Sequence, residues 1–200
     1  MSTLRSRANS GRLTGKDLIN TGIYSAIYFV MIMALAMTGY IPIMMPLLCV
    51  IGPLVGGIPF MLFLTKVKKF GMILIMSAIM GIMMALTGMG FYALPVALVS
   101  GLIAELLWKR ADYSRARSSV FVCGFFHVWI WGNFVPLFTN PDGYFATRAE
   151  FGTDYEAALT ALLPPWMNPA LLVCCFVFGV LGGLLGRAML KKHFIKAGIA

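Results

Sequence analysis

IMMPLLCVIGPLVGGIPFMLFL, residues 43–64, carries no charged side chain. The hydrocarbon core of a bilayer is about 30 Å thick, and an α-helix needs roughly 20 apolar residues to cross it. This stretch is therefore long and apolar enough to form a membrane-spanning helix. Similar apolar stretches recur along the chain, and together they predict six spans at about 18–40, 43–64, 70–88, 92–108, 118–138 and 167–190.

The composition of the whole chain agrees with a membrane protein. Of its 200 residues, 60% are hydrophobic and 12% are charged, and the mean hydropathy is +0.88. Soluble domains carry about 25% charged residues. We therefore predict an all-α integral membrane bundle of six transmembrane helices over residues 18–190. The cysteines lie in apolar spans without a CxxC or metal-type spacing and are expected to be buried thiols; they are Cys49, Cys123, Cys174 and Cys175.

Basic residues are segregated along the chain. Of the 16 Lys and Arg residues, all but Arg148 lie near the termini or in the second and fourth connections between spans. Because basic connections remain on the cytoplasmic side, we predict a basic cytoplasmic segment over 1–17 and a basic cytoplasmic tail over 191–200. Contact of this rim with anionic lipid accounts for the net charge of +9 without a nucleic-acid partner.

The fifth connection, residues 139–166, is long and acidic. It holds four acidic residues and one arginine, a net charge of −3. Loops of this length are more often functional than idle, so we expect an extracellular lid. A solvated surface excursion is the alternative. Residues 154–163 could form a short helix with Thr153 as its N-cap.

GFFHVWIWGNFVP, residues 124–136, places polar and aromatic groups within the fifth span. At 100° per residue, His127 and Trp131 share one face of a helix, and Trp129 and Asn133 share nearly the opposite face. Pro136 would clash with the preceding turn, which predicts a break between Gly132 and Pro136. Polar groups inside a membrane and an aromatic-lined cavity both indicate a ligand site. The alternative is an interhelical hydrogen bond, with the tryptophans in an interfacial belt.

Other features of the spans predict contacts between helices. Glu105 precedes Lys109 by four residues, a spacing that favours an ion pair. Two overlapping GxxxG pairs in the last span, and Gly22 with Ala26 in the first, favour close helix approach. These small residues serve either internal packing or docking to a separate membrane subunit; the GxxxG pairs are Gly179/Gly183 and Gly182/Gly186.

Four stretches carry a family resemblance that covers about the whole chain: GKDLINTGIYSAIYFV, IPIMMPLL, GLIAELLW and HVWIWGNFVP. They look like the Trep_Strep family of substrate-binding S components of energy-coupling factor (ECF) transporters. The resemblance implies a multi-pass subunit of the bacterial plasma membrane with cytoplasmic termini, which captures a small micronutrient from outside. Its partners would be a coupling membrane subunit and two ATPases, and the ATP would be used by these partners. The chain itself would need no cofactor and would not be an enzyme.

The resemblance also implies which residues bind and dock. The pocket would lie among outer loops one, three and five and the outer halves of helices four to six. Its residues would be Tyr40, Phe91, Tyr92, Asn133, Asn140 and Trp166, with Trp129, Trp131 and His127 below them. Relatives dock through an alanine pair spaced by three on helix one, where this chain has Gly22 and Ala26, and Gly179 and Gly183 are further docking candidates. The substrate does not follow from the resemblance, although the acidic loop disfavours a strongly anionic ligand.

Three other classes of protein remain as alternatives. An intramembrane metalloprotease would need clustered His and Glu ligands, and His127 is the only histidine within the predicted spans. A self-sufficient secondary transporter or channel would normally show inverted halves or a continuous polar path. A structural membrane protein is the third alternative.

Overall fold

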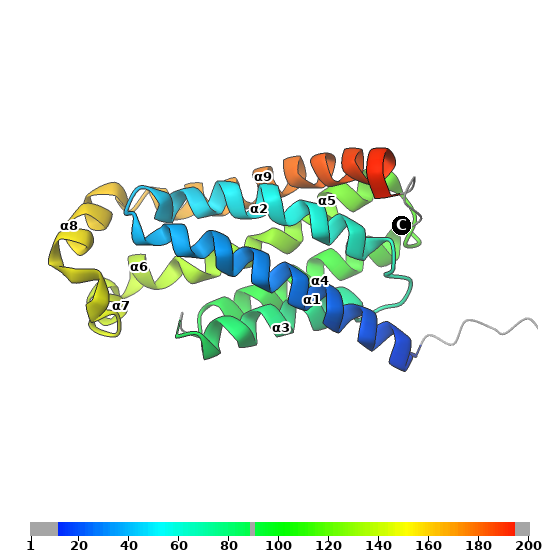
Figure 1. Ribbon diagram of the computed structural model, residues 1–200, viewed down its shortest axis with the longest axis horizontal. Helices are drawn as coiled ribbons and strands as arrows, with labels where there is room; N and C mark the ends of the chain where they lie inside the picture. Colours follow the sequence, from blue (N-terminus) through cyan, green and yellow to red (C-terminus); the bar gives the residue numbers. More distant parts are fainter. Residues whose placement is uncertain (1–11, 89–90, 195–200) are drawn as a thin grey trace, which may run out of the picture.

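The computed structural model describes residues 12–88 and 91–194. All regular structure in these residues is helical, and the long helices run side by side in an elongated bundle (Figure 1). The chain is therefore an all-helical membrane bundle, as predicted. The long helices are α1 (Gly15–Ala36), α2 (Met44–Leu64), α3 (Met72–Leu86), α4 (Ala93–Arg110), α5 (Ala116–His127) and α9 (Met167–Met189). By length and composition, the helical segments Gly15–Tyr40, Met44–Leu64 and Met167–Lys192 are able to cross a membrane. Residues 1–11 and 195–200 of the predicted basic termini lie outside the described residues.

The first helix begins at a capping box and is tied to the next connection. The Thr14 hydroxyl accepts a hydrogen bond from the Asp17 backbone N–H at 3.4 Å, and the Asp17 carboxylate accepts one from the Thr14 backbone N–H at 2.8 Å. Such reciprocal bonds satisfy the free N–H groups of a first helical turn. The Asp17 carboxylate also lies 2.8 Å from the Lys69 ammonium in the α2–α3 connection. The start of α1 is thereby fixed to the basic end of the bundle.

Both glycine pairs of α9 pack within the chain. A Cβ atom at Gly186 would lie 2.7 Å from the backbone oxygen of Gly57 in α2, and Gly182 meets the α2 backbone directly. Gly179 and Gly183 are buried against α5, where their added Cβ atoms would lie 2.9 and 3.0 Å from the nearest atoms. Small residues allow helices to approach this closely. Internal packing is thus the use of these glycines, and Gly179 and Gly183 leave no free face for docking.

Glu105 has a different role from the predicted ion pair. Its carboxylate is buried and accepts hydrogen bonds from the backbone N–H groups of Ile73 at 2.8 Å and Leu74 at 3.1 Å, in the first turn of α3. Lys109 instead lies over the Phe70 ring, 5.2 Å from its centroid. The prediction of a Glu105–Lys109 pair was wrong, because α3 offers free N–H groups and the positive end of its dipole.

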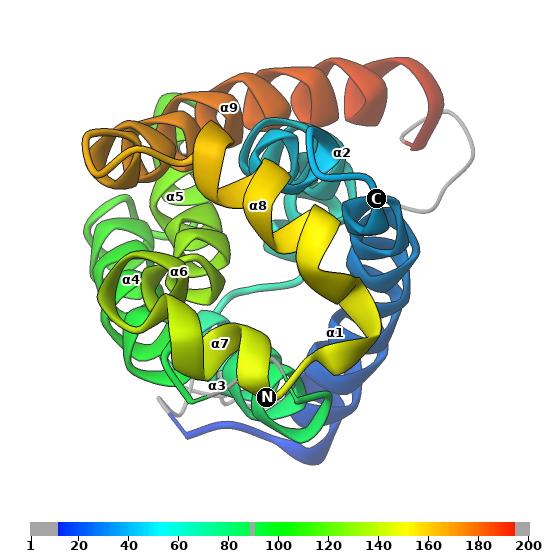
Figure 2. The same ribbon diagram turned by 90° about the vertical axis from the view of Figure 1, so that its left-hand side faces the viewer.

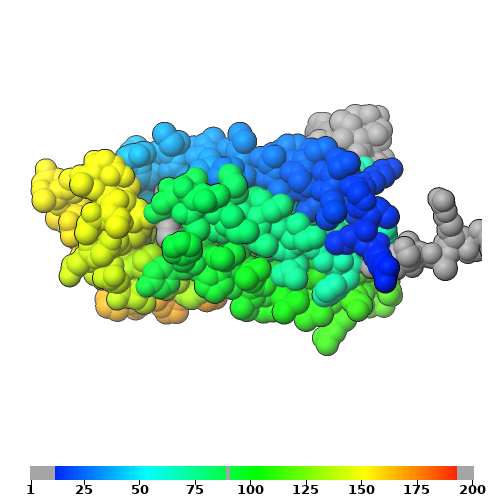
Figure 3. Space-filling model, turned by 90° about the horizontal axis from the view of Figure 1, so that it is seen from below, coloured from blue at the N-terminus to red at the C-terminus, as the bar shows by residue number. Residues whose placement is uncertain are grey.

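The connection over 139–166 is folded into short helices across the other end of the bundle. These elements are α7 (Pro141–Ala146), η3 (Ala149–Phe151) and α8 (Gly152–Leu162). They follow η2 (Val128–Asn133) and α6 (Val135–Thr139), which continue the fifth predicted span. Figure 2 shows α7 and α8 lying across this end, and Figure 3 shows the same segment in yellow beyond α1 and α3. The predicted helix in the loop exists, but it begins at Gly152, so Thr153 is not its N-cap. The Asn140 side chain caps α7 by accepting from the Gly143 N–H at 3.2 Å.

Candidate binding cavity

The fifth helical segment breaks before it reaches its proline. Regular α-helix ends at His127, residues Val128–Asn133 form a 3₁₀ helix, and α6 begins at Val135 with Pro136 in its first turn. In the first turn of a helix, backbone N–H groups have no partner within the helix, so proline loses no hydrogen bond at this position. The predicted break is confirmed, although it begins earlier than Gly132.

The break borders a cavity of about 480 Å³ near the end covered by the 139–166 segment. This volume falls within the range of about 300–1,000 Å³ that is typical of small-molecule sites. The walls come from α1, η1 (Met37–Tyr40), α2, the end of α3, η2 and residues 147–151. Lining residues include Ile32, Leu35, Tyr40, Met45, Leu48, Gly52, Met84, Trp129, Ile130, Asn133, Arg148 and Phe151.

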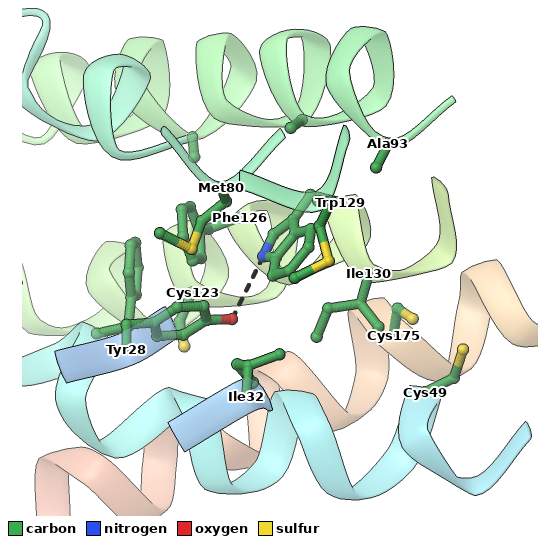
Figure 4. Packing of buried hydrophobic residues seen from close by; sticks show 14 of the residues in the cluster. Tyr28, Ile32, Cys49, Met80, Ala93, Cys123, Phe126, Trp129, Ile130 and Cys175 are labelled. Atoms are coloured by element: carbon green, nitrogen blue, oxygen red, sulfur yellow. Dashed lines mark hydrogen bonds between the residues drawn. The ribbon is translucent and has the colours of Figure 1, made fainter. Parts of the chain in front are cut away.

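Aromatic side chains close the cavity toward the basic end. Trp129, at the floor, donates a hydrogen bond from Nε1 to the Tyr28 hydroxyl at 3.3 Å (Figure 4). Nearby, the Phe60 and Phe126 rings stack with their centroids 4.0 Å apart. The Tyr28 ring meets Phe126 edge to face at 5.5 Å. These rings are buried and pack against one another, so they form the floor of the cavity.

Two polar side chains in the wall have capacity for a ligand. Asn133 donates from Nδ2 to the Ile130 carbonyl at 3.1 Å, and its buried Oδ1 has no hydrogen-bond partner. Arg148 is 8% exposed, and its guanidinium donates to the Tyr144 carbonyl at 2.9 Å and the Gly88 carbonyl at 2.6 Å. It also donates to the Thr147 hydroxyl at 3.0 Å. The cavity wall therefore holds one unpaired buried acceptor and one buried cation.

The 139–166 segment is held down over the cavity. The Tyr155 hydroxyl donates to the Gly39 carbonyl of η1 at 2.5 Å. The Phe151 ring lies 5.4 Å from the Tyr40 ring and stacks on Tyr155 at 4.4 Å. Burial raises the pKa of Tyr155 to about 12 and also raises the pKa of Tyr144. Tyr155 therefore stays a neutral donor at physiological pH.

Three of the predicted site residues meet at the cavity: Tyr40, Trp129 and Asn133. His127 lies outside the cavity wall, buried against the aromatic floor, where Nδ1 donates to the Cys123 carbonyl at 2.7 Å. Its Nε2 has no partner. Trp131 points to the other side of the segment, where Nε1 donates to the Asn168 side chain at 2.8 Å. It borders a separate apolar hollow between α4, α5 and α9.

The other predicted residues lie at the surface near this end. Phe91 is 77% exposed, and Tyr92, Asn140 and Trp166 are also exposed; none of them lines the cavity. The three outer loops and the fifth helical segment line the cavity as the resemblance implied, but α4 and α9 supply none of the wall, and α1 and α2 supply wall that the resemblance did not assign. Their contribution was missed because their lining residues are ordinary apolar side chains. Arg148 was also missed, although it had a signal: it is the one basic residue away from the basic rim.

The candidate docking residues Gly22 and Ala26 lie on an exposed strip of α1. A Cβ atom at Gly22 would have no neighbouring atom within 4 Å. The same strip exposes large apolar side chains, among them Ile19, Ile23 and Val30. This face of α1 is unoccupied within the described part of the chain.

The fold and cavity define the class of the protein: an integral membrane protein with a helical bundle and a ligand-sized cavity near one end. Within the described residues, no group of three or more His, Cys, Asp and Glu side chains could hold a metal ion. The chain belongs to the Trep_Strep family of hypothetical bacterial integral membrane proteins, which it matches over residues 15–196. No curated protein and no solved structure matches it.

Proposed function

We propose that this protein is the substrate-binding S component of an ECF-type importer in the bacterial plasma membrane. It would capture a small micronutrient from outside and deliver it inward with a coupling membrane subunit and two ATPases. The observation that carries the proposal is the cavity of about 480 Å³, which lies at the end of the bundle opposite the basic rim. A site at that end, covered by a folded loop, suits capture from outside.

The proposal includes six membrane crossings with both termini in the cytoplasm. It is supported by the described charges, since Arg148 is separated along the bundle from the Lys and Arg residues near the ends of α1, α2, α4 and α9. By the positive-inside rule, the cavity end then faces outward. An exposed cysteine on α8, Ala158→Cys, should react with a membrane-impermeant maleimide in intact cells. Arg117→Cys at the opposite end should react only after lysis, and the reverse pattern would overturn the orientation.

The floor of the cavity favours a carrier that needs a partner over a channel. A channel or self-sufficient transporter needs a path that continues toward the other side. Here, Trp129 bonded to Tyr28 and Phe60 stacked on Phe126 fill the bundle beneath the cavity. Release inward would therefore require a large movement of the subunit, which the coupling subunit and ATPases would drive.

The exposed strip of α1 is the proposed docking face for the coupling subunit. Gly22 and Ala26 would let a partner helix approach closely, and a bulky side chain there would prevent this approach. Ala26→Trp is therefore the test variant. Val173→Trp is the matched control, because Val173 is an exposed apolar residue on α9, away from the proposed face.

The experiment is affinity purification of the tagged chain from native membranes in mild detergent, followed by protein mass spectrometry. We expect the wild type and Val173→Trp to retain two ATPases and one coupling protein in similar amounts, and Ala26→Trp to lose them. Wild type purified without any ATPase would contradict the proposed function. Ala26→Trp that retains its partners fully would contradict only the docking face.

A further inference from the structure

We infer that the cavity binds a small molecule that joins a flat apolar body to one carboxylate, and that this carboxylate pairs with Arg148. The inference rests on the proposed function, because it names the class of substrate for the same cavity. It depends on the charge, burial and partners of Arg148, on the free acceptor of Asn133 and on the apolar character of the remaining wall.

The charge of Arg148 is buried without a counter-ion. Its side chain is 8% exposed, and its hydrogen bonds go to two carbonyls and one hydroxyl, all of them neutral. No carboxylate of the described residues lies within 4.0 Å of its guanidinium. Glu150 also lines the cavity, but it is exposed and forms no ion pair with Arg148. Burying an unpaired charge is costly, so a ligand that supplies the opposite charge is favoured.

The guanidinium is also held in a fixed place. It bonds to Gly88, two residues after the end of α3, and to Tyr144 in α7, and it lies over the Tyr144 ring at 3.9 Å from the centroid. Three of its five N–H groups have these partners, which leaves donors for a ligand. A donor group that is already ordered loses little entropy on binding. The fork geometry of arginine suits a carboxylate in particular.

The rest of the wall defines the remainder of the ligand. Trp129, Ile32 and Leu48 supply apolar and aromatic surface, which fits a flat hydrophobic body. Asn133 also lines the cavity, and its Oδ1 has no hydrogen-bond partner, which favours a ligand that carries an N–H or O–H group. The acidity of the 139–166 segment disfavours a strongly anionic molecule. A ligand with a single negative charge is compatible with that acidity.

The test uses three probes that share an indole ring and a three-carbon chain: indolepropionate, indolepropionamide and indolepropylamine. They differ in charge and little in size, and the indole N–H can reach an acceptor. Each is titrated into the purified full-length protein in detergent at neutral pH by calorimetry. We expect the propionate to bind at least about tenfold more tightly than the amide, a difference of about 1.4 kcal/mol, and the amine to bind more weakly than both.

Variants assign this preference to Arg148. Arg148→Gln should abolish the preference, so that the propionate and the amide bind with similar affinity, and retained amide binding would report an intact cavity. Arg187→Gln is the matched control, since Arg187 donates to the Ala116 carbonyl at the far end of the bundle, and it should behave as wild type. Glu150→Gln should strengthen propionate binding relative to amide binding, because a nearby negative charge is removed. The Glu150 variant tests the inference even if Arg148→Gln does not fold.

The outcomes separate the inference from the proposed function. Equal binding of propionate and amide to wild type, or an unchanged preference in Arg148→Gln, would overturn the inference and leave the cavity as a substrate site. Failure of wild type to bind any of the three probes would overturn the inference as well. In each of these cases, the proposed function still stands if the wild-type chain purifies with its ATPases and coupling subunit.

Discussion

Replacing Glu105 should destabilise the bundle more than a substitution in the 139–166 segment. Its carboxylate accepts the hydrogen bonds of backbone N–H groups in the first turn of α3. The N-cap of α3 is Gly71, which has no side chain to accept a hydrogen bond and has a φ of 103°. Glu105 Oε2 accepts from Ile73 and Leu74 in its place, at 2.8 and 3.1 Å. Among the described residues, the two N–H groups have no other acceptor.

The size of the effect follows from what each substitution leaves behind. Glu105→Ala leaves two backbone N–H groups unpaired, and each costs about 1–3 kcal/mol when buried. The expected loss is therefore about 2–6 kcal/mol of the free energy of unfolding. Glu105→Gln keeps an oxygen acceptor but loses the negative charge at the positive end of the helix dipole, which is worth about 0.3–2 kcal/mol. The expected loss for glutamine is about 1 kcal/mol.

The assay is reversible unfolding in detergent micelles, followed by tryptophan fluorescence during titration with a denaturing detergent. Lys109→Ala is the control for the ion pair that the sequence favoured. Since the Lys109 ammonium lies over the Phe70 ring, its loss should cost about 0.5–1 kcal/mol. The reasoning fails if Glu105→Ala unfolds within about 0.5 kcal/mol of wild type, or if Lys109→Ala costs as much as Glu105→Ala.

Three further predictions concern the cavity, the helix contacts and the loop. Once a ligand is in hand, Asn133→Ala should weaken its binding by about 1–3 kcal/mol because a ligand donor loses its acceptor, and Trp131→Phe should bind normally in the same titration. Gly182→Leu should cost at least about 3 kcal/mol of unfolding free energy, since its Cβ would lie 2.8 Å from a backbone oxygen of α2, whereas Gly22→Leu should be near neutral in the same unfolding assay. Tyr155→Phe should cost about 1 kcal/mol of unfolding free energy. The stability that the Tyr155 hydroxyl contributes should be complete below pH 10.0 and fall as the pH rises toward 12, because the folded state holds the phenol proton more tightly. A pH series of unfolding that gives parallel curves for wild type and Tyr155→Phe would contradict the last of these.

The apolar segments of the sequence predicted the long helices well, and helix periodicity predicted part of the cavity. The separation of Trp129 and Asn133 from Trp131 follows from 100° per residue and holds in the structure even though the segment is partly 3₁₀. Which of the two faces lines the cavity could not be predicted, because that depends on the position of α1 and α2. Pro136 correctly indicated a break, but the unwinding extends back to Val128.

Contacts between residues distant in sequence were the main source of error. Glu105 has a suitable partner four residues away, yet it bonds to a turn 31 and 32 residues earlier. A local pattern contains no information about such a helix end. The GxxxG pairs likewise predicted close helix contact but not the partner helices, which are α2 and α5. Arg148 was noticed only as an exception to the charge pattern, although a lone cation in an acidic loop is itself a reason to look for an anion.

The division of the bundle into two halves explains how one chain can be both rigid and able to bind. Toward the basic end, α9 touches the α2 backbone through Gly182 and Gly186, and Glu105 caps α3. Toward the other end, the 3₁₀ segment opens the fifth helix, and the loop covers the resulting space through contacts such as Tyr155 with η1. The close glycine contacts of the basic end leave no volume for a ligand, whereas the unwound segment and the loop at the other end leave about 480 Å³. A substitution in the tight half should therefore change stability with little effect on intrinsic affinity. A conservative substitution in the cavity wall should do the reverse, because cavity-lining groups are not all satisfied within the protein.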